Sequence, residues 1–222
     1  MIYEWMVKGI DLNNYLQACK DADLSNFKQD RRLTKIFEHS TIAQALDYLQ
    51  LIEKQTPNLF DNKFTNDNYG SPDIKNFHGR KYSPSTMQYI GVLSNLIYHF
   101  GTLSDLRIVE IGGGYGGQCR TIMDVFEPAC YHIIDLPEVC ELQRRYCKAE
   151  CFSAPTKQQY DLCISNYALS EINNNETYIN DVVLKSKHGY ITCNTNFVEL
   201  PIEHKKLPDI PNERKENYIL IW

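Results

Sequence analysis

Residues 112–117 contain five glycines and form the part of the sequence best suited to bind a ligand. An apolar, β-branched run at 107–111 precedes them and predicts a buried strand. Glycine lets the backbone turn sharply and approach a ligand closely. Asp135 follows a second apolar run at 131–134. An acid in this position accepts hydrogen bonds from ribose hydroxyls, so the pattern predicts a nucleoside-binding site.

Glu110 distinguishes between two kinds of nucleoside ligand. Gly112, Gly114 and Gly117 satisfy G-x-G-x-x-G, so a nicotinamide dinucleotide, and with it an oxidoreductase, is one alternative. Glu110 stands two residues before the first glycine, where its carboxylate would repel a pyrophosphate. S-adenosyl-L-methionine has no phosphate and carries an ammonium and a sulfonium, so the charge favours this cofactor.

The composition is typical of a soluble globular protein. The chain has 222 residues, of which 43% are hydrophobic and 23% charged, and a formal net charge of -5. The negative charge and the lack of a basic run argue against nucleic acid as a partner. No apolar stretch predicts membrane insertion and no signal-peptide pattern is present. The eight cysteines form no C-x-x-C pair, so we expect reduced, packed thiols, a cytoplasmic location and no metal site.

Local patterns predict helices up to about residue 100 and alternating strands and helices thereafter. The capping box Thr41-x-x-Gln44 predicts one helix, and Ser85-x-x-Gln88 predicts another that ends at Gly101. The polar stretch 58–83 predicts an irregular segment, which is either a lid over the site or a plain surface loop.

The second part of the chain predicts a mostly parallel, Rossmann-like α/β sheet with ligands at the carboxyl ends of its strands. We therefore divide the chain into a helical N-terminal region, residues 1–100, and a cofactor-binding α/β domain, residues 101–222. The expected strands lie near 107–111, 131–134, 150–152, 161–165, 189–194 and 218–222, and the expected helices begin near Gln118, Pro137 and Asn173.

Residues 69–222 resemble the sugar O-methyltransferase family, a group of class I S-adenosylmethionine-dependent methyltransferases. Several separate motifs in the same order carry the resemblance, and the first 60 residues have no part in it. One departure is Gln88, where we expect an arginine. The matching segments are Tyr69-Gly70-Ser71-Pro72, residues 83–89, residues 109–118, Asp135-Leu136-Pro137-Glu138-Val139, residues 164–171 and Gly189-Tyr190-Ile191.

The resemblance implies transfer of a methyl group to a hydroxyl of a sugar or glycan, with a deoxyhexose such as rhamnose as a candidate acceptor. It is also compatible with a part in a larger glycan-synthesis protein or with a homo-oligomer. An alternative from another class is a catalytically silent S-adenosylmethionine-binding module. The cofactor contacts that the resemblance and the fold together imply are Glu110, Gly112, Gly114, Gly116, Asp135, Leu136, Ser153, Asn166, Tyr82 and Ser85.

A sugar hydroxyl is a poor nucleophile at neutral pH, so a general base should assist the transfer. Glu171 follows the fourth strand of the α/β part and is the first candidate; its alternative role is a helix cap or salt bridge. His78, in the polar stretch, is the second candidate and is otherwise a solvated histidine. No tight carboxylate cluster demands a divalent metal.

Overall fold

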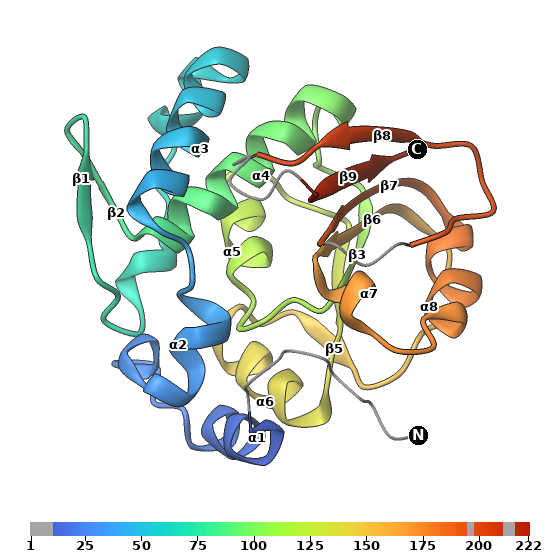
Figure 1. The fold of residues 1–222 in the computed structure, drawn as a ribbon, viewed down its shortest axis with the longest axis horizontal. Coiled ribbons are helices and arrows are strands. Elements are labelled where there is room, and N and C mark those ends of the chain that lie inside the picture. The colour runs from blue at the N-terminus through green and yellow to red at the C-terminus, as the bar shows by residue number, and fades with distance from the viewer. Residues whose placement is uncertain (1–10, 195–197, 211–215) are drawn as a thin grey trace.

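A seven-stranded sheet forms the centre of the computed structural model, which describes residues 11–194, 198–210 and 216–222 (Figure 1). The strand order is β5-β4-β3-β6-β7-β9-β8. Strands β3 to β7 are parallel, whereas β9 runs antiparallel to its neighbours β7 and β8. The strands are β3 (Arg107–Ile111), β4 (Cys130–Ile134), β5 (Glu150–Phe152), β6 (Tyr160–Asn166), β7 (Ser186–Cys193), β8 (Lys205–Pro208) and β9 (Tyr218–Ile221).

Helices cover both faces of this sheet, which explains why its central strands are apolar on both sides. On β3, Ile108 packs into the core with the N-terminal helices, whereas Val109 and Ile111 pack into the core on the opposite face. The predicted Rossmann-like, mostly parallel sheet with a helical N-terminal region is therefore confirmed.

The helices follow the local signals in most places. Thr41 and Gln44 form the predicted capping box, and Gly101, with φ of 76°, ends the helix before it. The helix predicted to begin at Ser85 is capped two residues earlier by Ser83, because Pro84 occupies its first turn. The helices are α1 (Leu12–Asp21), α2 (Arg31–Phe37), α3 (Ile42–Gln55), α4 (Pro84–Phe100), α5 (Gly117–Met123), α6 (Pro137–Tyr146), α7 (Ala168–Glu171) and α8 (Glu176–Asp181).

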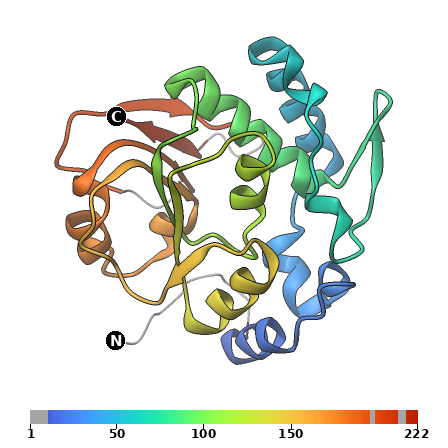
Figure 2. The ribbon, with the colours of Figure 1, turned by 180° about the vertical axis from the view of Figure 1, so that it is seen from behind.

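The helices form layers around the sheet. α4, α5 and α6 lie on one face, and α7 and α8 lie on the other (Figure 1). α1, α2 and α3 form a further layer outside the first group, as the opposite view also shows (Figure 2). One hydrophobic core joins this outer layer to the sheet, so the N-terminal region and the sheet pack as a continuous body. In the described parts of the chain no helix combines the length and the apolarity that a membrane crossing requires.

The segment 58–83, which we expect to be irregular, contains short regular elements between its irregular stretches. This segment contains short 3₁₀ turns at Pro57–Asp61 and Asn66–Asn68 and a hairpin of β1 (Lys75–Phe77) and β2 (Arg80–Tyr82). Asp67 accepts hydrogen bonds from the Ser83 and Thr86 hydroxyls, and Asp124 accepts from Thr65. These bonds attach the segment to α4 and α5.

Candidate active site

A cavity of about 460 Å³ opens at the carboxyl edge of the sheet. Its lining includes the turn after β3, Asp135 after β4 and Asn166 at the end of β6. Strands β4 and β6 lie on opposite sides of β3, so the strand order reverses at this point. Ligands of open α/β sheets bind at such a point.

The glycine turn shapes one wall of the cavity. Gly112 and Gly114 line it, and Gly114 has φ of +56°, a conformation that disfavours other residues. Gly116, predicted as a cofactor contact, lies outside the cavity lining. A side chain there would begin 2.6 Å from the Cys147 sulfur, so Gly116 permits the loop to pack against α6 and the residue after it.

Glu110 presents a buried carboxyl group to the cavity. Its Oε2 accepts a hydrogen bond from the Tyr131 hydroxyl at 2.8 Å. Burial raises the pKa of Glu110 to about 8, although the hydrogen bond from Tyr131 opposes the shift. A cationic ligand group beside it would restore the charged form.

Asp135 is held in place by two donors. The backbone N–H of Leu136 donates to Oδ1 and the Gln143 amide donates to Oδ2, both at 2.8 Å. The same Gln143 nitrogen lies 2.7 Å from the carbonyl oxygen of Gly114. Burial raises the pKa of Asp135 to about 7, and these hydrogen bonds oppose the shift. Gln143 thus connects the acid to the glycine turn.

The ends of β6 and β7 form the opposite wall. Glu171, the last residue of α7, accepts a hydrogen bond from Asn194 Nδ2 at 3.0 Å, and both residues line the cavity with Asn166. Glu171 does not cap the next helix, because Asn175 takes the N-cap position of α8. Tyr167 has φ of 69°, which is rare for an aromatic residue, and its hydroxyl donates to Asp209 at 2.7 Å.

Not all of the predicted site residues reach the cavity. Six of them line it: Glu110, Gly112, Gly114, Asp135, Asn166 and Glu171. Besides Gly116, five lie elsewhere. Leu136 is buried in the core, Ser153 is exposed, Tyr82 packs against Phe60 and Phe64, Ser85 is buried in the first turn of α4, and His78 lies in the hairpin.

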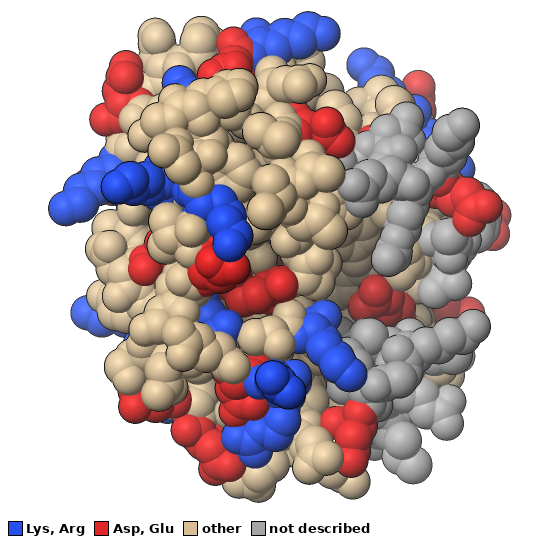
Figure 3. Space-filling model, turned by 60° about the vertical axis from the view of Figure 1, so that its left-hand side comes forward, with Lys and Arg blue, Asp and Glu red and all other residues tan. Residues whose placement is uncertain are grey.

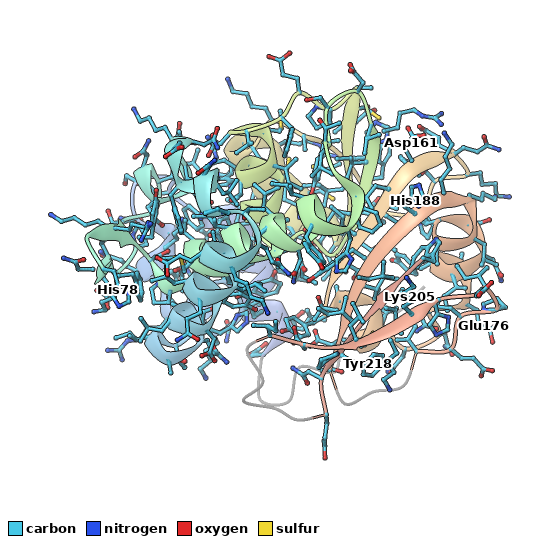
Figure 4. All side chains as sticks on the ribbon, turned by 90° about the horizontal axis from the view of Figure 1, so that it is seen from above. His78, Asp161, Glu176, His188, Lys205 and Tyr218 are labelled. Atoms are coloured by element: carbon cyan, nitrogen blue, oxygen red, sulfur yellow. The ribbon has the colours of Figure 1, made fainter. Side chains whose placement is uncertain are left out.

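His78 lies far from Glu171 for a structural reason. It is in the turn between β1 and β2, and the ion pair of Arg80 with Glu53, at 3.0 Å, ties this hairpin to α3. Figure 4 shows His78 at the left-hand end of the molecule, whereas Lys205 and Tyr218 lie in its right-hand half. The hairpin therefore packs on the outer helical layer instead of closing over the cavity.

The link between α2 and α3 supplies a wall of the cavity that the sequence patterns missed. Phe37, Ser40, Thr41 and Gln44 line it, although the first 60 residues have no part in the family resemblance. The Phe37 ring lies 3.6 Å from the position of a Cβ on Gly114. The Ser40 hydroxyl donates to Gln88 Oε1, at the position where the resemblance leads us to expect arginine. No local pattern in this link indicates binding.

Charge is mixed on the surface. On the face shown in Figure 3, acidic and basic side chains lie interspersed among uncharged ones. Within the described ranges, no group of three or more histidine, cysteine, aspartate or glutamate side chains is placed to hold a metal ion.

Among known proteins, only solved structures are similar to this chain, and the similarity is one of fold. A scan against protein-family models gives no match, and a search of curated proteins gives none either. The crystal structure of Thermoplasma acidophilum 1320 is 16% identical over 63% of this chain and 88% of its own, with a TM-score of 0.42.

Two other solved structures are methyltransferases. Magnesium protoporphyrin IX methyltransferase from Synechocystis PCC 6803, with bound SAH, is 10% identical over 61% of this chain and 81% of its own, with a TM-score of 0.44. An S-adenosylmethionine-dependent methyltransferase from Mesorhizobium loti is 16% identical over 56% of this chain and 60% of its own, with a TM-score of 0.37. The Rossmann-like fold of this chain is seen in its own strand order and in the parallel pairing of β3 to β7.

Proposed function

We propose that this protein is an S-adenosylmethionine-dependent O-methyltransferase that methylates a hydroxyl of a sugar within a glycan. One observation carries the proposal: a single cavity is lined by Glu110, the glycine turn, Asp135 and the candidate base Glu171. The cavity volume, about 460 Å³, is within the usual range for small-molecule sites.

The residues on the β3–β4 side fit the cofactor. Glu110 is suited to the ammonium end, Asp135 to ribose hydroxyls, and the backbone of Gly112 and Gly114 to close approach. When bound, S-adenosylmethionine supplies an electrophilic methyl group.

The residues on the β6–β7 side fit proton transfer from an acceptor hydroxyl. Asn194 donates to one oxygen of Glu171 and so orients its carboxyl group. Its carboxylate is placed to take the proton from the acceptor hydroxyl during the transfer. Phe37 and Tyr48 from the outer helical layer line the same cavity and limit the access of water.

The choice of a sugar rests on the resemblance of residues 69–222 to the sugar O-methyltransferases, with a deoxyhexose such as rhamnose as the first acceptor to test. Calorimetry with S-adenosylmethionine, S-adenosylhomocysteine and NAD should show binding of the first two only. Transfer of labelled methyl to a panel of methyl glycosides then tests the reaction. Binding without transfer to any sugar would favour the silent-module alternative, and binding of NAD alone would favour an oxidoreductase.

A further inference from the structure

Three asparagines form a row across the carboxyl edge of the sheet. Asn166 ends β6, Asn194 directly follows β7 and Asn217 directly precedes β9, and all three line the cavity. Because β9 is antiparallel to β7, its beginning lies at the same edge as the end of β7. Neighbouring strands lie about 4.8 Å apart, so this asparagine row leads stepwise away from Glu110 on β3.

Two members of the asparagine row have unused acceptors. Among the described residues, Oδ1 of Asn166 and Oδ1 of Asn217 are buried and have no hydrogen-bond partner. The orientation of the Asn217 amide is set by its Nδ2, which lies 3.4 Å from an Asp209 carboxylate oxygen. Burial of a polar atom without a hydrogen-bond partner costs free energy. We therefore expect both oxygens to accept hydrogen bonds from a ligand or from water.

The charges next to the asparagine row restrict the ligand that could supply these donors. Glu171 contacts Asn194, and Asp209 contacts both Asn217 and Tyr167. Two carboxyl groups beside neutral amides would repel a phosphate or a carboxylate. Hydroxyl groups, by contrast, can donate to amide oxygens without bringing charge.

We propose that the asparagine row is the acceptor subsite and that it binds a neutral polyhydroxyl ring, whose hydroxyls donate to Asn166 Oδ1 and Asn217 Oδ1. The cofactor then occupies the β3–β4 half of the cavity and the acceptor occupies the β6–β7–β9 half. Asn194 has a different part, since its amide positions Glu171. This inference rests on the proposed function for the identity of the cofactor.

The test measures acceptor binding separately from turnover. The full chain, saturated with S-adenosylhomocysteine, is titrated with methyl α-L-rhamnopyranoside and followed by NMR. The permethylated form of this glycoside has the same ring without hydroxyl donors. We expect Asn217→Ala to weaken binding of the glycoside about tenfold, because one buried acceptor is lost, and to change the affinity for S-adenosylhomocysteine less than twofold. Asn180→Ala, on the exposed side of α8, is the matched control.

Each outcome separates this inference from the proposed function. If S-adenosylhomocysteine does not bind the unaltered protein, the proposed function fails and takes the inference with it. If it binds but the glycoside does not, or if the permethylated form binds equally well, only the inference is overturned. Unchanged glycoside affinity in Asn217→Ala also overturns it. Asn217→Leu, which keeps the size of the side chain and removes the acceptor, replaces this variant if Asn217→Ala does not fold, and the same loss is then expected.

Discussion

Gln143 donates a hydrogen bond of 2.8 Å to Asp135 Oδ2, and its amide nitrogen also contacts the carbonyl oxygen of Gly114 at 2.7 Å. Both partners are oxygens, so the orientation of the amide is unambiguous. One buried side chain on α6 therefore fixes the acid and the glycine turn relative to each other.

Replacing Gln143 should weaken cofactor binding in a pH-dependent way. Burial raises the pKa of Asp135 to about 7, and the hydrogen bond from Gln143 lowers it. In Gln143→Met this pKa should rise, so that more of the carboxyl group is protonated at pH 7. We expect affinity for S-adenosylhomocysteine to fall about tenfold at pH 7, and the midpoint of its pH dependence to move upward.

Calorimetry between pH 6 and pH 9 measures both effects. Gln50→Met, at an exposed position of α3, is the matched control. A uniform loss of affinity without any displacement of the midpoint would show that Gln143 has only a packing role.

Ionisation of Glu110 should lower the free energy of unfolding at alkaline pH. Burial raises its pKa from 4.5 to about 8 in the folded state. Below about pH 4.5 the carboxyl group is neutral in both the folded and the unfolded state, and its burial costs no charge. The free energy of unfolding then decreases as the pH rises through 8, because the folded state must bury the ionised carboxylate. Glu110→Gln keeps an oxygen that can accept the hydrogen bond from Tyr131 and removes the buried charge.

Without cofactor, we expect the melting temperature of Glu110→Gln to exceed that of the unaltered protein by about 5 °C at pH 8, with a smaller difference at pH 5. Thermal unfolding at the two pH values measures this difference. Equal melting temperatures throughout would mean that water solvates the carboxylate in the folded state.

Glu171→Gln should separate catalysis from binding. The amide keeps the size of the side chain but cannot accept a proton, so we expect turnover to fall about 10²–10⁴-fold while affinity for S-adenosylhomocysteine is retained. Labelled methyl transfer and calorimetry on the same sample give the two quantities. Glu176→Gln, at the exposed start of α8, is the control. Full turnover in Glu171→Gln would leave positioning alone as the source of catalysis.

Gly116→Ala should destabilise the fold. Gly116 has φ of +97°, and a Cβ would lie 2.6 Å from the sulfur of Cys147. We expect a loss of about 2 kcal/mol in the free energy of unfolding, from backbone strain and the steric clash together. Cys147→Ala in the same chain removes the clash and should recover part of this loss. Urea unfolding of the two variants measures it, and the absence of any recovery would assign the whole effect to the backbone.

Local patterns were sufficient for the elements that their own residues determine. The apolar run at 107–111 and the glycines after it predicted β3 and its turn, and Thr41 with Gln44 predicted the start of α3. These features depend on periodicity, capping and backbone freedom, which operate over a few residues. β8 was not predicted, because the exposed lysines of Lys205–Pro208 form an edge strand without an apolar pattern.

The sequence by itself determined that a glycine turn, Glu110 and Asp135 would meet at the end of a parallel sheet, because the carboxyl ends of parallel strands share one edge. Only the tertiary structure decided what else meets there. Phe37 reaches Gly114 from the N-terminal region, Gln143 from α6 reaches Asp135, and Asn217 comes from the beginning of an antiparallel strand. The tertiary structure also placed His78 on the outer helical layer. Such contacts join residues far apart in the chain through packing and burial, which no short stretch of sequence encodes.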